Sequence, residues 1–161
     1  MTASTRLWAP WRSRFIMHPT KRGCIFCQAL RSQDDRRSQV ILRGPKAFAL
    51  LNRYPYNNGH VMVAPRRHVG DVLVITPSEW AGMLSVTQQV MRRLQHTLHP
   101  HGFNLGVNLG RTAGAGIPGH LHLHLVPRWK GDTSFMPILT GTKVVSQSLD
   151  ELYHLLTKSR R

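Results

Sequence analysis

Three histidines alternate with leucines in the second half of the chain, in the segment His120-Leu121-His122-Leu123-His124. In an extended strand, residues two apart point to the same face, so this spacing predicts three neighbouring imidazoles with the leucines opposite. A neutral imidazole near pH 7 can act as a nucleophile, an acid or base, or a metal ligand. Because three adjacent imidazoles would repel one another if protonated, we expect them to be neutral, to bind a metal or to hold an anion.

Two other interpretations of this segment are open from the residue pattern alone. The three side chains could be exposed on a half-buried strand, or they could form a three-histidine catalytic zinc site. The surroundings argue against both, because a Gly-rich loop at residues 109–119 precedes the segment and Pro127-Arg128-Trp129 follow it. A Gly-rich loop lets a phosphate approach the main chain, which favours an anion-binding function.

The two cysteines of the chain form a Cys-x-x-Cys pair at Cys24 and Cys27. A disulfide is disfavoured in a cytoplasmic chain, and a thioredoxin-like redox pair would need a βαβ context that is absent here. A structural zinc site would need two further ligands from elsewhere in the sequence. The remaining alternative is a pair of reduced thiols that pack under a sheet.

Basic residues strongly outnumber acidic ones: 22 Lys and Arg against 7 Asp and Glu give a net charge of +15. A cleft in such a protein attracts anions, which include nucleotides, nucleic acids and anionic membranes, and disfavours a strongly cationic substrate. The few carboxylates argue against a paired-carboxylate glycosidase and against an all-carboxylate calcium or magnesium site. The basic residues are scattered and form no recognised RNA- or DNA-binding motif, so a nucleic-acid-binding module is the weaker alternative.

A length of 161 residues fits one domain. We expect residues 1–22, which are basic and contain Trp8 and Trp11, to form an arm, and residues 23–161 to form the folded domain. No apolar run approaches the roughly 20 residues of a membrane span, and the N-terminus lacks the apolar segment of a signal peptide. The sequence therefore predicts a cytoplasmic protein with no membrane partner.

Short apolar segments bounded by Gly, Pro and Asn predict the strands that must position these side chains. The predicted strands are residues 40–42, 47–51, 60–64, 103–108 and 120–127, with Gly44-Pro45 as the turn of a hairpin. Residues 28–37 are polar and fit either a short helix or a loop. Several strands with few crossover segments predict an α+β domain on an antiparallel sheet of about five strands.

One long helix is predicted to begin after Thr76, which is followed by a proline and, three residues on, by Glu79 in a capping-box pattern. Apolar residues recur at helical spacing over residues 80–98, and Pro100 prevents the helix from continuing. We expect this apolar stripe to face the core. The same capping pattern at Ser148 predicts a short C-terminal helix.

Together these segments resemble the histidine-triad (HIT) family. Residues 120–126 match the family's alternation of histidines with hydrophobic residues, and residues 51–68 (LNRYPYNNGHVMVAPRRH) are similar to its ribose-binding turn and Gly-His strand. The resemblance covers about residues 20–130 and is strongest to small bacterial members identified as diadenosine tetraphosphate phosphorylases. It implies a HIT-like fold and a homodimer or larger homo-oligomer.

The activity that the resemblance implies is a two-step displacement at the α-phosphate of a dinucleoside polyphosphate such as diadenosine tetraphosphate. The middle histidine, His122, would be the nucleophile and would form a covalent nucleotidyl-histidine, while His124 and His60 would hold the phosphate oxygens. Inorganic phosphate or water would then accept the nucleotide, with no organic cofactor. A nucleoside phosphoramidate hydrolase or general nucleotide hydrolase of the same fold is the alternative.

The resemblance also implies which residues contact the substrate. Asn52 matches the family's polar residue for the ribose hydroxyls, and Asn108 lies where related enzymes place an amide beside the phosphates. The family often has Gln or Ser shortly before the triad, where this chain has Gly116 and Ile117. Trp129 is placed either to stack on a second base or to pack in a dimer contact.

A structural zinc site is implied as well. Zinc-bearing members of the family take one ligand from a histidine after a Pro-basic pair and one from the first triad histidine. The matching set in this chain is Cys24, Cys27, His68 and His120. A closed four-ligand site has no open position, so this zinc would join the N-terminal segment to the histidine strand and would not activate water.

Overall fold

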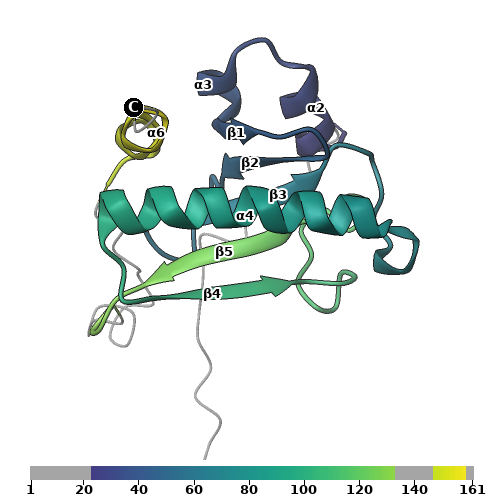
Figure 1. Cartoon of the computed structure of the whole chain (residues 1–161). Helices are drawn as coiled ribbons and strands as arrows, with labels where there is room; N and C mark the ends of the chain where they lie inside the picture. Colours follow the sequence, from purple (N-terminus) through teal and green to yellow (C-terminus); the bar gives the residue numbers. More distant parts are fainter. Residues whose placement is uncertain (1–22, 133–146, 159–161) are drawn as a thin grey trace, which may run out of the picture.

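The computed structural model describes residues 23–132 and 147–158, so the arm expected at residues 1–22 lies outside the described residues. Within these ranges, one antiparallel sheet has five strands in the order β1-β2-β3-β5-β4 (Figure 1). The strands are β1 (Val40–Arg43), β2 (Ala47–Leu51), β3 (Val61–Pro65), β4 (Gly102–Val107) and β5 (Leu123–Arg128). The α+β class and the antiparallel sheet expected from the sequence are confirmed.

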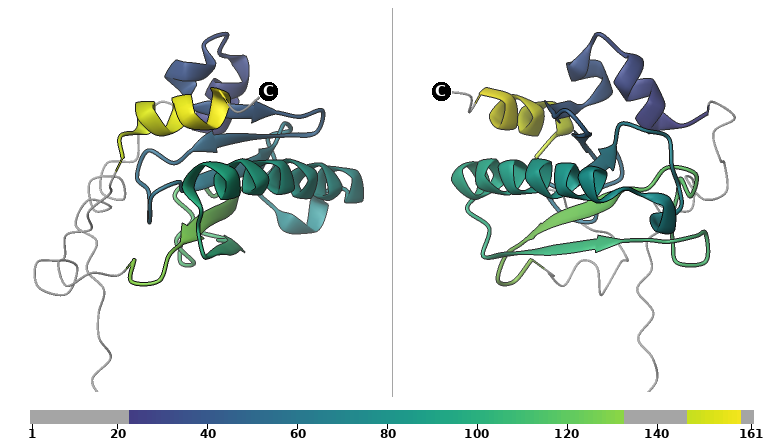
Figure 2. Two further views of the ribbon diagram at one scale, coloured as in Figure 1. Left: turned by 60° about the vertical axis from the view of Figure 1, so that its left-hand side comes forward. Right: turned by 45° about the vertical axis from the view of Figure 1, so that its right-hand side comes forward.

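The helices lie on both faces of this sheet. Those in the described ranges are α2 (Ile25–Arg31), α3 (Asp35–Ser38), the short 3-10 helix η1 (Val72–Val74), α4 (Pro77–Leu98) and α6 (Leu149–Lys158). α4 runs along one face with α6 beside it, and α2 and α3 stand at the β1 side of the sheet (Figure 2). The long helix and the short C-terminal helix are therefore confirmed.

The alternation of strand residues divides the core into two layers. On one side of the sheet, Leu51 and Leu125 pack with Leu94 of α4 in the larger apolar cluster. On the other side, Phe48 of β2 packs with Phe26 of α2 in a smaller cluster. Successive side chains of a strand point to opposite faces, and an apolar cluster covers each face of these strands. β2 and β3 are therefore buried along their whole length.

The strand predicted over residues 120–127 is wrong at its beginning. β5 starts at Leu123, so His120 and His122 precede the ladder. The neighbouring strand β3 reaches Pro65 at this level, and proline has no N–H with which to extend the pairing. The chain before β5 is held instead by a 2.7 Å hydrogen bond from the Leu121 N–H to a carbonyl in the loop after β3.

The other predicted elements agree with the structure to within one or two residues. The hairpin around Gly44-Pro45 joins β1 to β2. The polar segment 28–37 lies in two short helices, α2 and α3, joined by a brief turn. At the other end of the chain, Ser148 Oγ accepts a 3.2 Å hydrogen bond from a backbone N–H in the first turn of α6, as the capping pattern predicts.

The N-terminus of α4 is fixed by a capping box that also reaches the segment carrying His68. The Glu79 N–H donates to Thr76 Oγ1 at 3.2 Å, and the Thr76 N–H donates back to Glu79 Oε2 at 2.9 Å. The guanidinium of Arg67 donates two hydrogen bonds of 2.8 Å to the same carboxylate. The start of the helix therefore holds the chain directly before His68.

Gly59 makes possible the tight turn that delivers His60. Its φ of +73° lies in the left-handed region, which favours glycine. A Cβ atom at this position would lie 2.9 Å from side-chain atoms of both Leu98 and Pro127. Any other residue would push this turn away from α4 and β5, and His60 would move with it.

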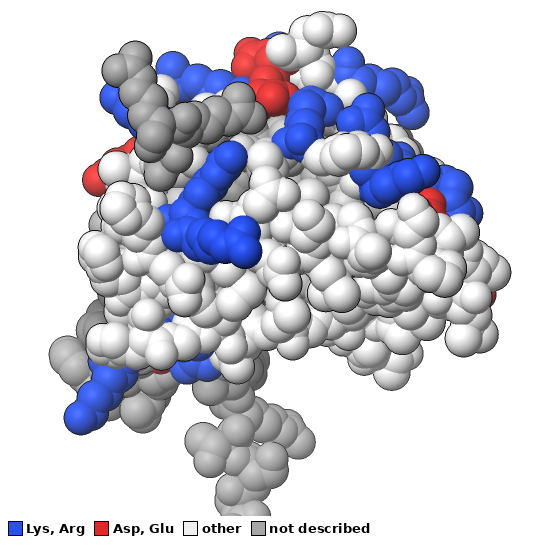
Figure 3. All heavy atoms as spheres, viewed as in Figure 1, with Lys and Arg blue, Asp and Glu red and all other residues white. Residues whose placement is uncertain are grey.

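Figure 3 shows the distribution of charge on one face of the molecule. On the α4 side of the molecule, Lys and Arg lie in several separate groups around a broad uncharged area, with few acidic side chains between them (Figure 3). This agrees with the scattered basic residues of the sequence. Among the described residues, no helix combines the length and the apolar character needed to cross a membrane.

Acid is expected to weaken the contact between α4 and the segment before His68. Hydrogen bonds from Arg67 and from the Thr76 backbone lower the pKa of Glu79 from 4.5 to about 2. Because the folded pKa is lowered, this contribution to the free energy of unfolding is complete above pH 4.5 and is lost as the pH falls towards 2. Urea unfolding at a series of acid pH values should show this loss in wild type and in Thr76→Ser, which keeps the hydroxyl. Glu79→Gln should lack it, and an unchanged profile in that variant would contradict the assignment.

Candidate functional site

Four side chains that can bind a metal converge from three segments of the chain, and we call them the Cys/His cluster. Cys24 caps α2 and Cys27 lies in its first turn, whereas His68 follows β3 and His120 precedes β5. Their ligand atoms all lie within 4.8 Å of one another. His120 Nδ1 lies 3.2 Å from Cys24 Sγ, 3.6 Å from Cys27 Sγ and 3.3 Å from His68 Nδ1.

The cluster fits a tetrahedral cation. The Nε2–H of His120 donates to the Pro65 carbonyl at 2.9 Å, so the lone pair on Nδ1 faces the thiols. Bond lengths of about 2.3 Å to sulfur and 2.0 Å to nitrogen place tetrahedral ligand atoms roughly 3.3 to 3.8 Å apart, close to the separations found. Burial, with the Cys24 thiol, raises the pKa of Cys27, and a divalent cation would counteract this because it binds the thiolate.

His122 is oriented by one backbone hydrogen bond. Its Nδ1–H donates to the His120 carbonyl at 2.8 Å, so the lone pair of the neutral ring is on Nε2. Burial lowers the pKa of His122 below its usual 6.5, and the side chain is only 5% exposed. The ring is therefore neutral at pH 7, with its nucleophilic nitrogen determined by the backbone.

His60 and His124 form a second, ordered pair. The Tyr56 N–H donates to His60 Nδ1 at 3.0 Å, so His60 carries its proton on Nε2 and donates it to His124 Nδ1 at 2.9 Å. A neutral His124 then carries its own proton on Nε2. The Tyr56 ring stacks on His60 with centroids 4.6 Å apart, which holds the pair in place.

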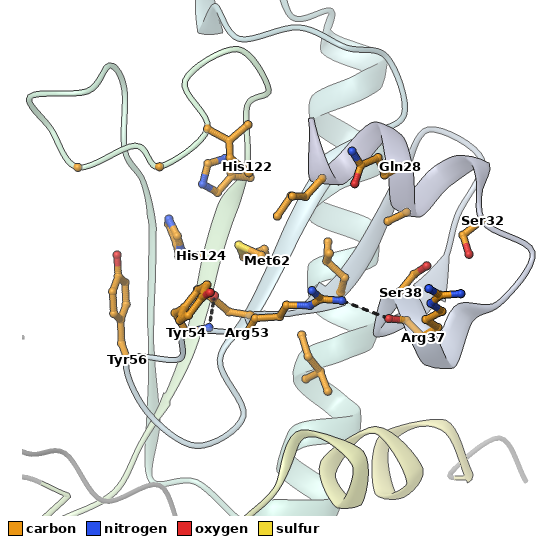
Figure 4. A pocket seen from close by; sticks show the side chains of 18 residues that line it. Gln28, Ser32, Arg37, Ser38, Arg53, Tyr54, Tyr56, Met62, His122 and His124 are labelled. Atoms are coloured by element: carbon orange, nitrogen blue, oxygen red, sulfur yellow. Dashed lines mark hydrogen bonds between the residues drawn. The ribbon is translucent and has the colours of Figure 1, made fainter. Parts of the chain in front are cut away.

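His122 and His124 border a cavity of about 430 Å³, whereas His60 is not among its lining residues. His122 and His124 lie at one end, and the Arg53 side chain runs towards Arg37 at the other (Figure 4). The middle of the cavity is apolar. The apolar lining comes from Ile25 and Ala29 of α2, Leu50 and Leu51 of β2, Met62 of β3, and Ile117. An apolar cavity with histidines at one end and cationic side chains at the other suits a ring-bearing anion.

Among the described residues, no carboxylate lines this cavity. The nearest acidic side chains along the chain have other contacts. Asp35 accepts two hydrogen bonds from Arg43, and Asp34 accepts one from the Arg37 N–H. An anion that enters the cavity therefore meets arginine and histidine side chains and no like charge among the lining residues.

The residues expected to contact substrate are only partly brought together. Asn52 and Gly116 line the cavity, whereas Asn108 and Trp129 are not among the lining residues. Asn52 Oδ1 accepts the Tyr54 N–H at 2.9 Å, and its amide nitrogen lies 3.3 Å from His60 Nδ1. Trp129 Nε1–H donates to a carbonyl at the end of α4 at 3.3 Å.

The sequence pattern misses the contribution of α2 to the cavity. Ile25, Gln28 and Ala29 all line it, although residues 28–37 gave no clear structural signal. Gln28 and Ala29 follow Ile25 by three and four residues, which is helical spacing. This spacing next to a metal-binding motif could have indicated a helix in the cavity wall. Phe26 was also missed, and its ring contacts two of the triad histidines.

Comparison with known proteins identifies the family. A HIT domain model matches residues 33–131. An AP-4-A phosphorylase from Mycobacterium tuberculosis is 39% identical over 159 residues, which cover 94% of this chain and 82% of that protein. The chain belongs to the HIT domain family. A bis(5'-nucleosyl)-tetraphosphatase (asymmetrical) from Schizosaccharomyces pombe is 34% identical over 97 residues, 60% of this HIT chain and 53% of that protein.

Solved structures support the same membership. The crystal structure of a Zn-bound histidine triad family protein from Mycobacterium smegmatis superposes with a TM-score of 0.68 and 28% sequence identity. The match covers 84% of this HIT chain and 91% of that one. The HIT resemblance drawn from residues 51–68 and 120–126 is therefore confirmed.

Proposed function

We propose that this HIT protein cleaves a dinucleoside polyphosphate, such as diadenosine tetraphosphate, through a covalent nucleotidyl-His122, with inorganic phosphate as acceptor. The observation that carries the proposal is the neutral, backbone-oriented His122 at the end of a nucleotide-sized cavity. Support also comes from relatives named AP-4-A phosphorylase and bis(5'-nucleosyl)-tetraphosphatase. The family alone would equally fit a nucleoside phosphoramidate hydrolase.

In the first step, His122 Nε2 attacks the α-phosphorus and forms a P–N bond. The bond from that phosphorus to the bridging oxygen breaks, and ATP leaves with the electron pair of this bond. In the second step, a phosphate oxygen attacks the same phosphorus, the P–N bond breaks, and ADP is released with His122 neutral again. Two moderate displacements replace one difficult one, which is the advantage of a covalent intermediate.

The His60–His124 pair would stabilise the charge on the phosphorus oxygens. Because His60 donates to His124 Nδ1, the Nε2–H of His124 is the group that can donate to a phosphate oxygen. Asn52 and Tyr56 hold His60 in this arrangement before the substrate binds. Donors that are already oriented need no rearrangement as charge develops, and this lowers the barrier.

The cavity would hold one nucleoside with its phosphate at the histidine end. The base would lie between Ile25 of α2 and Leu50 of β2, and Gly116 would let the phosphate approach the main chain. The arginines at the other end add favourable charge for an anion. The second nucleotide would extend outside the cavity, where Asn108 and Trp129 are the proposed contacts.

We further propose that the Cys/His cluster holds a structural zinc ion. Two thiolates and two imidazoles in a tetrahedral arrangement are a donor set that Zn²⁺ prefers. Support comes from the distances between the four ligand atoms and from a Zn-bound histidine triad relative of known structure. When bound, the ion would supply structural stability and no reactive water, because all four positions are taken by the protein.

Product analysis tests the reaction. With diadenosine tetraphosphate and inorganic phosphate we expect ADP and ATP, and without phosphate little or no turnover. AMP and ATP in the absence of phosphate would indicate a hydrolase. No turnover of this substrate, with cleavage of a nucleoside phosphoramidate, would overturn the proposal in favour of the alternative.

The nucleophile is tested by His122→Ala. We expect its turnover to fall by more than about 10³-fold, as in other enzymes that lose a covalent nucleophile. Mass spectrometry of rapidly quenched wild type should find one nucleotidyl group on a peptide containing His122. The matched control is His96→Ala, which removes an exposed histidine of α4 and should leave activity unchanged. An active His122→Ala variant would contradict the mechanism.

Metal analysis tests the zinc proposal. We expect the protein to bind one equivalent of Zn²⁺ and its melting temperature to fall on chelation, because the ion joins three segments of the chain. His68→Ala should weaken Zn²⁺ binding by more than about 100-fold. Loss of a direct ligand should cost more affinity than loss of an outer-shell partner, which costs about 10-fold to 100-fold. The control is again His96→Ala, and equal metal content in the two variants would exclude the cluster as the site.

A further inference from the structure

The turn between Cys24 and Cys27 carries two apolar residues into the candidate active site. Ile25 lines the cavity, and Phe26 is fully buried beneath it. The two residues lie between the two thiols in sequence, so the geometry of the Cys/His cluster sets where they lie. A change in the cluster would therefore alter the cavity wall and the packing beneath it.

One aromatic ring covers two triad histidines. The Phe26 centroid lies 4.9 Å from that of His120, at an interplanar angle of 42°, and also 4.9 Å from that of His122, at 35°. Behind it, Phe48 meets the Phe26 ring edge-on at 6.4 Å. In this close-packed layer, Phe26 cannot shift without opening space beside His122.

A second contact joins His122 to the same cluster. Its Nδ1–H donates to the carbonyl of His120, whose own ring is a member of the cluster. His120 in turn is anchored through its Nε2–H to the Pro65 carbonyl. The backbone bond and the Phe26 ring therefore both relate the orientation of His122 to the arrangement of the cluster.

We propose that Phe26 is a positioning residue that couples cation occupancy of the Cys/His cluster to the orientation of His122, so that cation and nucleotide bind cooperatively. This inference rests on the proposed function and on the proposed zinc site. A cation that draws the two thiols together fixes the turn, and the turn holds Phe26 against the imidazole. A nucleotide that needs His122 in one orientation then favours the occupied cluster.

Cooperativity of this kind must be reciprocal. If Zn²⁺ raises nucleotide affinity by a given factor, the nucleotide raises Zn²⁺ affinity by the same factor. We expect a factor of about 5 or more, the lower end of typical couplings between sites. A nucleoside monophosphate is a suitable probe, because it occupies the cavity without turnover.

The experiment measures both directions of this coupling. Zn²⁺ affinity is obtained by competition with a chromophoric chelator, with and without saturating AMP. AMP affinity is obtained by calorimetry on the Zn²⁺-loaded and Zn²⁺-free full chain, after circular dichroism confirms that the latter is folded. If the Zn²⁺-free chain unfolds, Zn²⁺ binding is linked to folding, so the effect of AMP in the chelator competition is compared between wild type, Phe26→Leu and Phe48→Leu.

Phe26→Leu and Phe48→Leu form a matched pair for the test. Both remove a ring from the same buried cluster, but Phe26 packs against His120 and His122, whereas Phe48 packs against Phe26. We expect the coupling factor to fall below about 2 in Phe26→Leu and to persist in Phe48→Leu. Phe26→Met replaces Phe26→Leu if that variant does not fold.

Two further readouts separate positioning from a general loss of stability. In Phe26→Leu, kcat should fall about 10-fold to 100-fold, whereas KM should rise by no more than the lost coupling factor of about 5, and Phe48→Leu should keep both values. Nitrogen-15 NMR of the imidazoles should show one His122 tautomer, protonated at Nδ1, in wild type and Phe48→Leu. It should show a mixture in Phe26→Leu.

Several results would overturn the inference. A wild-type coupling factor near 1 would do so while leaving the proposed function intact, provided that AMP binds. Equal losses of coupling in Phe26→Leu and Phe48→Leu would reduce Phe26 to a packing residue. If AMP does not bind wild type in either metal state, both the inference and the proposed function fail.

Discussion

The 2.8 Å hydrogen bond from the His122 Nδ1–H to the His120 carbonyl is the contact on which the rest of the site depends. It uses the single ring proton of neutral His122 and thereby fixes which nitrogen keeps a lone pair. Its acceptor is backbone, so its position is set by whatever holds His120. Those anchors are the Pro65 carbonyl, the thiols at the start of α2 and His68. The proposed chemistry thus follows from how three segments meet beside the sheet.

The sheet supplies the rigid frame for that meeting. β3 is the central strand and β5 is its neighbour. The histidines of the site lie just outside the ends of these two strands: His60 before β3, and His120 and His122 before β5. Close packing fixes these ends. Gly59 brings the turn before β3 against Leu98 and Pro127, with no room for a side chain. Residues at the ends of rigid strands can be aimed at a ligand without disturbing the backbone hydrogen bonds of the core.

Sequence reasoning predicts the features that depend on local signals. Thr76 and Glu79 define the start of α4 because a capping box is a contact between near neighbours. The alternation at residues 120–126 correctly separates leucines from histidines, and the family resemblance supplies the four cluster ligands. Local signals could not show that β5 begins only at Leu123, since this depends on where β3 reaches its proline. They also could not place Phe26 on His122, because that contact requires the folded positions of α2 and β5.

The wide separation of the cluster ligands along the chain has a consequence for folding kinetics. Cys24 and His120 are 96 positions apart, so most of the domain must be assembled before their side chains meet. Of the four cluster ligands, only Cys24 and Cys27 are near neighbours along the unfolded chain. Full four-ligand affinity therefore arises late, after β3 and β5 have paired, because contacts between distant residues form slowly. A cation whose ligands come together after the rate-limiting barrier slows unfolding more than it speeds folding.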